Sequence, residues 1–215
     1  MDNRIIHRPT RLLKSGLLAL TASIVFAVTA APEARLAASD RITVSDVYWD
    51  DQVVGSSTLV RTPNGLSFTY HTSGLPAGYA FTLWIVVFNN PKACFTNPCS
   101  DKDIFENPAA QADFLWGAGH VIGGNGVGNF GGHLRVGDTS RSGLAELTGS
   151  PTVGLLYPMS AEIQMAIHSH GPAVPGETLK AQLSSFLGGC KVLLDVVDFP
   201  DEVGECVTFQ SSIHQ

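Results

Sequence analysis

From residue 41 onward, the apolar residues of this chain recur mainly with a period of two. Residues 66–70, for example, read Leu-Ser-Phe-Thr-Tyr. This is the period of a strand that turns one face to a core and the other to solvent. Clusters of Gly, Pro, Asn, Asp and Ser, typical of turns, separate such segments at residues 62–65, 72–78, 89–91 and 137–140. The chain is therefore predicted to be an all-β domain, an antiparallel β-sandwich with at most one or two short helices.

Later segments continue the alternation. Further strands are predicted at residues 114–122, 130–136, 161–168, 191–197 and 206–213. A short helix is predicted at residues 106–113, because Pro108 stands near a first turn and good helix formers follow it.

Residues 79–88 differ because both faces are apolar. One face carries Phe81, Leu83, Ile85 and Val87, and the other carries Trp84, Val86 and Phe88. A strand that is apolar on both faces must be covered on both sides. We therefore expect a central strand with a helix or loop over its outer face, and a contact between two copies in a homodimer is the alternative.

The first forty residues have the order of a secretory signal. Basic residues between Arg4 and Lys14 precede an apolar stretch at residues 15–28, and small residues follow. This stretch is shorter than the roughly 20 residues that a membrane-spanning helix needs. We predict a signal peptide at residues 1–30, with Ala37–Ala38 as an alternative cleavage site, then a flexible mature N-terminus at 31–40 and a single domain at 41–215. The protein is expected to be secreted or periplasmic, with no membrane span in the mature chain.

Four cysteines, an even number in an exported chain, predict disulfides. Three pairings are possible, and proximity along the chain favours Cys94 with Cys99 and Cys190 with Cys206. A four-thiolate zinc site is the alternative, but the paired Cys-x-x-Cys knuckles that such sites favour are absent.

The charge of the mature chain argues against two classes of partner. Removing residues 1–30 takes away four basic residues and Asp2, which leaves nine basic and eighteen acidic side chains and a net charge of about −9. Such a surface repels nucleic acids and anionic membranes. Five acidic residues gather near the C-terminus, where a calcium site is the alternative to a solvated edge: Asp195, Asp198, Asp201, Glu202 and Glu205.

The sequence contains no common catalytic motif in the structural setting that the motif requires. Gly126, Gly128 and Gly131 match G-x-G-x-x-G in form, but they lead into a predicted strand and not into the helix that a dinucleotide site needs. No G-x-S-x-G elbow occurs, and paired cysteines leave no thiolate nucleophile. We expect these glycines to serve bulges and close backbone approaches.

The sharpest chemical feature is the sequence His168-Ser169-His170 at the end of a predicted strand. Residues two apart in a strand share a face, so both imidazoles are expected on the polar side, with Glu162 and Gln164. With a third ligand from His120 or His133, they would form a zinc or copper site. Two solvated histidines before a Gly-Pro turn are the alternative.

The same region shows a family resemblance. Three short segments resemble, in order, the closing signature of the chordin-type (CHRD) domain. They are residues 167–168, Pro175-Gly176-Glu177 and residues 179–183. The resemblance implies an extracellular β-sandwich similar to copper-zinc superoxide dismutase, in which residues 179–183 form a short strand. An immunoglobulin-like sandwich is the other form that the predicted fold class allows. The stretches 88–91 and 170–173 also resemble uncharacterised exported bacterial proteins.

Together these observations favour a non-enzymatic exported domain. We expect it to bind a protein or glycan partner or to serve an envelope role, without a cofactor. The alternative is a copper- or zinc-binding protein similar to superoxide dismutase.

Overall fold

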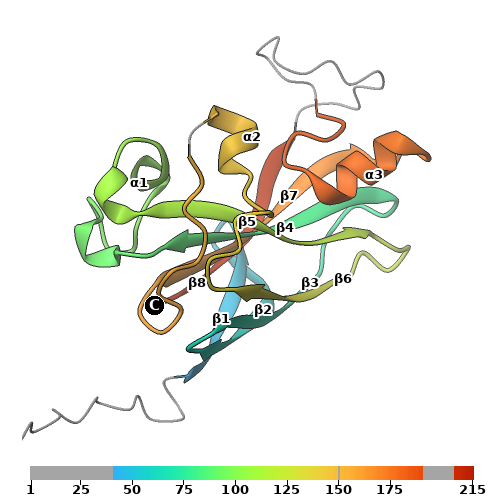
Figure 1. The fold of residues 1–215 in the computed structure, drawn as a ribbon. Coiled ribbons are helices and arrows are strands. Elements are labelled where there is room, and N and C mark those ends of the chain that lie inside the picture. The colour runs from blue at the N-terminus through green and yellow to red at the C-terminus, as the bar shows by residue number, and fades with distance from the viewer. Residues whose placement is uncertain (1–40, 150, 191–205) are drawn as a thin grey trace, which may run out of the picture. The chain divides into compact units, whose positions relative to one another are not determined.

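The computed structural model describes residues 41–149, 151–190 and 206–215 (Figure 1). These residues belong to one compact unit, 36–215. The strands are β1 (Ile42–Trp49), β2 (Gln52–Thr62), β3 (Gly65–Thr72), β4 (Tyr79–Phe88), β5 (Ala112–Val121), β6 (Gly128–Arg135), β7 (Glu162–Pro172) and β8 (Val207–His214). The helices are α1 (Asp101–Phe105), α2 (Leu144–Thr148) and α3 (Glu177–Ser184), with 3-10 turns η2 (Pro91–Ala93) and η3 (Pro108–Ala110).

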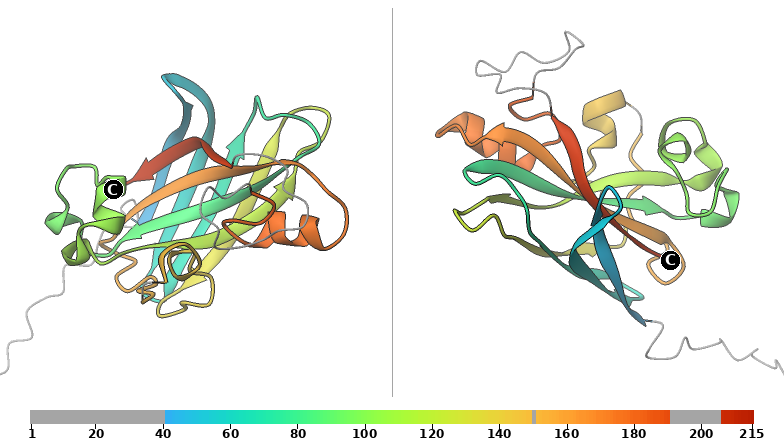
Figure 2. Two further views of the ribbon diagram at one scale, coloured as in Figure 1. Left: turned by 90° about the horizontal axis from the view of Figure 1, so that it is seen from above. Right: turned by 180° about the vertical axis from the view of Figure 1, so that it is seen from behind.

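The eight strands form one antiparallel sheet in the order β5-β4-β7-β8-β1-β2-β3-β6. The sheet curls until its two end strands, β5 and β6, come into contact, which leaves a nearly closed, barrel-like sandwich (Figures 1 and 2). The predicted all-β antiparallel class is confirmed.

Glycine permits the close approach at this seam. A Cβ on Gly132 of β6 would lie 2.8 Å from the ring of Phe68 and 3.2 Å from the carbonyl oxygen of Gly117 on β5. A side chain at this position would force the Phe68 ring to shift and would crowd the backbone of β5, so glycine here serves the close approach of the two strands. Gly128 and Gly131 lie within strand β6, which agrees with the expectation that they do not open a helix.

The main core fills the inside of the curled sheet. Its fully buried side chains come from strands far apart in the sequence, among them Val47, Leu59, Leu66, Leu83, Leu115, Ile163 and Ile167. These are the alternating positions that the period of two predicted, since one face of each strand points inward.

Strand β4, predicted to be central, lies inside the sheet but next to its end strand β5. It pairs with β5 on one side and β7 on the other, and its inner face joins the main core. Its outer face carries Trp84 and Phe88, which pack into two smaller clusters with residues of the α1 region, with Leu144 of α2 and with Phe186 after α3. Helices and loops of the same chain therefore cover the outer face, in agreement with the expected helix or loop (Figure 1).

The helices differ in detail from the prediction. The described residues contain three α-helices, one more than expected, and α1 lies before the helix predicted at 106–113, which is only the turn η3. Residues 179–183, expected as a strand, lie in α3. The sequence there, Leu-Lys-Ala-Gln-Leu, contains strong helix formers, and Glu177 stands in the first turn where a negative charge is favourable.

Two predictions fall on residues outside those described. They are the strand at 191–197 and the five acidic residues between Asp195 and Glu205. None of the helices in the described part of the chain has the length and hydropathy to span a bilayer.

Candidate functional site

Both predicted disulfides are present. Cys94 pairs with Cys99 and Cys190 with Cys206, with Cα atoms 5.4 and 5.3 Å apart. Each pair sits in its own group of side chains, the first with Asp103 and the second with His168. The four cysteines therefore do not come together, and the alternative of a four-thiolate zinc site is wrong.

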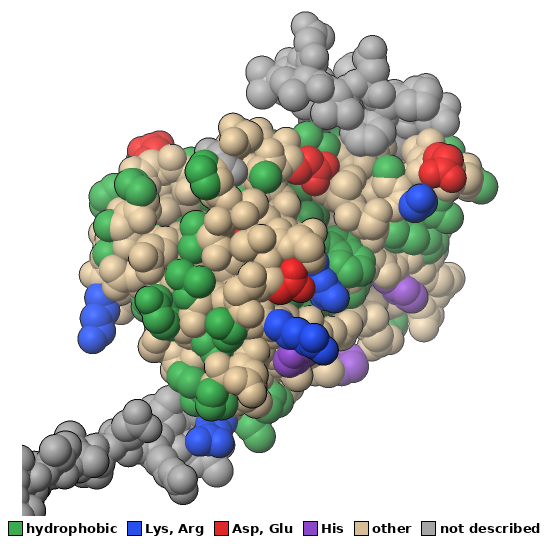
Figure 3. Space-filling view, in the orientation of Figure 1, with side chains coloured by type: hydrophobic (Ala, Val, Ile, Leu, Met, Phe, Trp, Pro, Cys, Tyr) green, Lys and Arg blue, Asp and Glu red, His purple; other side chains and the backbone are tan. Residues whose placement is uncertain are grey.

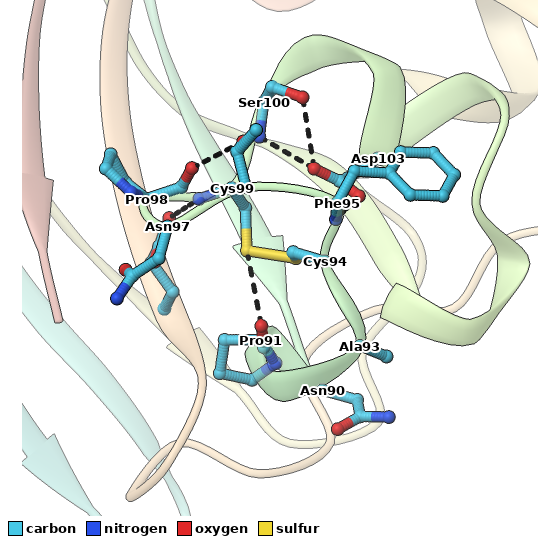
Figure 4. The surroundings of a disulfide bond; sticks show 12 residues. Asn90, Pro91, Ala93, Cys94, Phe95, Asn97, Pro98, Cys99, Ser100 and Asp103 are labelled. Atoms are coloured by element: carbon cyan, nitrogen blue, oxygen red, sulfur yellow. Dashed lines mark hydrogen bonds between the residues drawn. A yellow bond between two sulfur atoms is a disulfide. The ribbon is translucent and has the colours of Figure 1, made fainter.

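The loop closed by Cys94 and Cys99 is held by one buried carboxylate (Figure 4). Asp103 accepts hydrogen bonds from the backbone N–H of Phe95 at 2.8 Å and of Ser100 at 2.9 Å. The Ser100 hydroxyl and the Asn107 amide donate two more, at 3.1 and 2.8 Å. Both carboxylate oxygens are therefore occupied, and this group is structural.

A pocket of about 620 Å³ opens beside this loop. Its lining includes Lys92, Phe95, Asn97, Glu162 and Gln215. Glu162 is buried and already accepts from the backbone N–H of Cys99 at 2.9 Å, while the Phe95 ring is 62% exposed. The pocket thus combines an exposed aromatic ring with amide and charged groups.

His168 and His170 lie side by side on β7, as their spacing predicted. Their ring centroids are 5.2 Å apart. His168 is opposite Thr82 of β4, and both belong to the outer face of the sheet. The alternative of two solvated histidines is wrong, because His168 is 6% and His170 only 1% exposed beneath the segment that follows α3.

His170 has partners for both ring nitrogens. Its Nδ1 lies 2.7 Å from the carbonyl oxygen of Gly188, which can only accept, so Nδ1 carries the proton. Its Nε2 lies 2.8 Å from Oγ1 of Thr82 and accepts from that hydroxyl. The Thr82 oxygen in turn accepts from the indole N–H of Trp84 at 2.8 Å. Each of the polar groups in the hydrogen-bond chain Trp84–Thr82–His170–Gly188 therefore has a partner.

His168 is different. Neither of its ring nitrogens has a hydrogen-bond partner among the described residues, although both are buried. Burial, with a smaller contribution from His170, lowers the pKa of His168 to about 3. The ring is therefore neutral at physiological pH and offers one donor and one acceptor.

An apolar pocket of about 200 Å³ contains this imidazole. Its wall is formed mainly by side chains of β4, α1, β5 and the segment after α3, namely Trp84, Val86, Ile104, Phe105, Phe114 and Phe186. Three of the rings pack on one another: the centroid of Phe186 is 5.0 Å from both Trp84 and Phe114. The site is a small aromatic cavity with a neutral imidazole in its wall.

His120, proposed above as a third metal ligand, does not join this site. It is opposite Phe81 on the β4–β5 ladder, whereas His168 is opposite Thr82, the next residue of β4. Since consecutive strand residues point to opposite faces, His120 faces the other side of the sheet from His168. Its ring instead lies 5.8 Å from Phe130 of β6.

His133 also lies elsewhere. It is exposed on β6, with its Nδ1 3.2 Å from the Ser67 hydroxyl. It lines a separate surface pocket with Arg135, Asp138 and Arg141, and Figure 3 shows basic, acidic and histidine side chains together on this face. The copper or zinc ligand set of His168, His170, His120 and His133 therefore does not fit: two members are elsewhere, and both nitrogens of His170 are occupied.

The search for relatives found no matching protein-family model, no similar curated protein and no similar solved structure. Function therefore has to be argued from the chemistry of the site itself.

Sequence reasoning identified His168 but missed the pocket around it. The sequence showed Trp84 and Val86 on the apolar outer face of a strand, which implied that a helix or loop covers that face. Phe186, which provides that cover over His168, gave no signal, because it lies in an irregular segment without periodicity. That the His168 nitrogens find no partner among the described residues follows from three-dimensional packing alone.

Proposed function

We propose that this protein is an exported, disulfide-stapled binding protein that holds a small apolar molecule in the pocket beside His168. The observation that carries the proposal is a buried imidazole in the wall of an apolar pocket, whose two ring nitrogens have no hydrogen-bond partner among the described residues. Leaving a buried donor or acceptor unpaired costs about 1–3 kcal/mol. A ligand with one hydroxyl or carbonyl group would remove that cost at one of the two nitrogens: a carbonyl accepts from the ring N–H, and a hydroxyl pairs with either nitrogen.

The volume of the pocket limits the ligand. An apolar cavity of about 150 Å³ is enough for benzene. A pocket of about 200 Å³ lined by aromatic rings suits a single six-membered ring with one small substituent. The aromatic walls favour an edge-to-face or offset arrangement of the ligand ring.

Export is the second part of the proposal. It is supported by the charged, apolar and small-residue order of the N-terminus and by the two disulfides, which persist in oxidising compartments. The proposed location is the periplasm or the medium.

A titration with two ligands of equal shape tests the binding proposal. Phenol and toluene differ only in exchanging a hydroxyl for a methyl group, and binding can be followed by chemical-shift changes of the backbone amides around Trp84 and Phe186. A net hydrogen bond contributes about 0.5–1.5 kcal/mol, so phenol should bind about 2- to 10-fold more tightly than toluene.

The variants isolate the imidazole. His168→Phe keeps an aromatic ring but removes the hydrogen bond, and it should abolish the preference for phenol. His120→Phe, on the opposite face of the sheet, should leave the preference unchanged. Equal affinity of the parent protein for phenol and toluene, or no shift around the pocket with either, would refute the proposal.

A second candidate function is glycan binding at the larger pocket beside the Cys94–Cys99 loop. It is favoured by the 62% exposure of Phe95 next to the amides of Asn97 and Gln215 and the amine of Lys92. Phe95→Ala should then weaken retention on immobilised neutral polysaccharides, while His168→Phe should not. Equal retention of Phe95→Ala and the parent would exclude this candidate.

A further inference from the structure

The disulfide Cys190–Cys206 lies directly against the two buried histidines. The sulfur of Cys190 is 3.5 Å and that of Cys206 is 3.9 Å from Nδ1 of His170. Both sulfurs also lie within 4.8 Å of a ring nitrogen of His168. The proposed binding pocket makes no use of these sulfurs.

We propose that reduction of the Cys190–Cys206 disulfide converts this cluster into a zinc site, with the two thiolates and His168 as ligands. The inference is independent of the small-molecule proposal, although both involve His168. The ligand set also differs from the four-histidine set that the structure does not assemble.

The distances suit a tetrahedral ion. Zinc binds thiolate sulfur at about 2.3 Å and imidazole nitrogen at about 2.0–2.1 Å, so ligand atoms around it stand roughly 3.4–3.8 Å apart. The His168 nitrogen is already within 4.8 Å of both sulfurs, and small side-chain rotations would bring all three to a common centre. The fourth position would be open to water.

The state of His168 favours ligation. A metal needs a neutral imidazole with an accessible lone pair. No hydrogen bond to a described residue has to break before a nitrogen of His168 can bind the ion. His170 is less suitable, because its Nδ1 would first have to give up its bond to Gly188.

The chemistry requires a dithiol reductant. A dithiol such as dithiothreitol transfers two electrons and two protons to the Cys190–Cys206 bond and becomes a cyclic disulfide, which leaves two cysteine thiols. Zinc then displaces the two thiol protons to solvent and forms two Zn–S bonds and one Zn–N bond. Two thiolates with one imidazole favour a borderline-soft ion such as Zn²⁺ over Mg²⁺ or Ca²⁺.

The second disulfide provides a matched control. Cys94, Cys99 and Asp103 are also close together, but all carboxylate positions of Asp103 are taken by the four donors described above. Reduction at that end of the molecule should therefore create no comparable site.

The experiment uses the purified full chain, oxidised or reduced with dithiothreitol, desalted without oxygen and offered Zn²⁺. Bound zinc is measured after a second desalting, and Co²⁺ replaces Zn²⁺ in a parallel sample to reveal thiolate-to-cobalt charge transfer. We expect about one zinc per reduced chain and none per oxidised chain. His168→Ala should raise the zinc Kd more than about 10-fold, whereas Cys94→Ser/Cys99→Ser should leave it unchanged.

Several outcomes would overturn the proposal. These are zinc retention by the oxidised protein equal to that of the reduced one, equal zinc affinity of reduced His168→Ala and parent, or cobalt binding without thiolate charge transfer. Circular dichroism guards against unfolding: if the reduced parent unfolds and zinc does not restore its spectrum, the site does not exist. Cys190→Ser/Cys206→Ser, folded by the same criterion, should bind no zinc, and binding by this variant would equally overturn the proposal.

Discussion

The ring of His168 stacks on the ring of Phe186, with their centroids 4.5 Å and their planes 18° apart. The two residues come from different elements, strand β7 and the segment after α3. The backbone N–H of Phe186 donates to the carboxylate of Glu146 on α2 at 2.9 Å, which ties this segment to a helix. The contact therefore joins β7, α2 and the segment after α3, and it keeps water from the imidazole.

Replacing the stacking partner should change the acid–base behaviour of His168. Phe186→Ala opens one wall and hydrates the imidazole, so the pKa of His168 should rise from about 3 toward the ordinary value of 6.5. The loss of ring contacts should also destabilise the fold by about 1–3 kcal/mol. An NMR pH titration of the histidine ring protons measures the first effect. Phe105→Ala, an exposed residue of the same pocket, should leave the pKa of His168 low; no difference between these variants would contradict the assignment.

The sequence predicted much of the fold, because the strands and the disulfides leave signals in short stretches of sequence. Alternation in segments such as residues 66–70 identified strands, because the side-chain period of a strand is visible without tertiary contacts. Proximity identified both disulfides. The period of two also placed His168 and His170 on one face. Whether that face is solvated depends on a cover formed by residues about 16 to 18 positions later. These residues lie in an irregular segment, and the period of the sequence does not show where such a segment lies in the fold.

At helix α3 the residues themselves were a better guide than the family resemblance. The resemblance assigned residues 179–183 to a strand, whereas the chain forms a helix there. Helix propensity in Leu-Lys-Ala-Gln-Leu was legible from the residues themselves. His120 illustrates a different difficulty, since only the register of β5 against β4 determines which face it occupies.

As the pH is lowered, this protein should begin to lose stability at a higher pH than a protein whose histidines are all exposed. Burial lowers the pKa of His168 to about 3 and those of His170 and His214 to about 4. Between pH 6.5 and these values the unfolded chain binds more protons than the folded one, so the free energy of unfolding falls as pH falls below about 6.5. The slope is at most about 1.4 kcal/mol per pH unit for each such histidine.

Urea denaturation between pH 7.5 and pH 4.5 measures this slope. His168→Phe removes one of the three protonation sites and should make the dependence shallower by up to one proton equivalent. Val44→Ala, which changes an exposed residue without an ionisable group, should leave the slope as in the parent. A slope for His168→Phe equal to that of the parent would show that His168 is not held neutral by the fold.

The two disulfides should differ in their contribution to stability. Cys190 and Cys206 are 16 positions apart in the sequence, and Cys94 and Cys99 are 5 positions apart. Loop-closure entropy then gives about 3 kcal/mol for the longer loop and about 2 kcal/mol for the shorter. Cys190→Ala/Cys206→Ala should therefore lower the free energy of unfolding by about 1 kcal/mol more than Cys94→Ala/Cys99→Ala. The reverse order in chemical denaturation would mean that local contacts, such as those of Asp103, outweigh loop closure.

The hydrogen-bond chain from Trp84 to Gly188 depends on the hydroxyl group of Thr82. Thr82→Val preserves shape but removes the hydroxyl that accepts from Trp84 and donates to His170, so two buried groups lose their partner. At about 1–3 kcal/mol for each, the variant should be destabilised by about 2–6 kcal/mol. Thr82→Ser keeps the hydroxyl and loses only a methyl group, so it should cost about 1 kcal/mol. Thermal or urea unfolding of the pair measures the contrast. Equal destabilisation by Val and Ser would mean that packing around β4, and not the hydroxyl, governs this position, and His170 would then have to be satisfied by Gly188 alone.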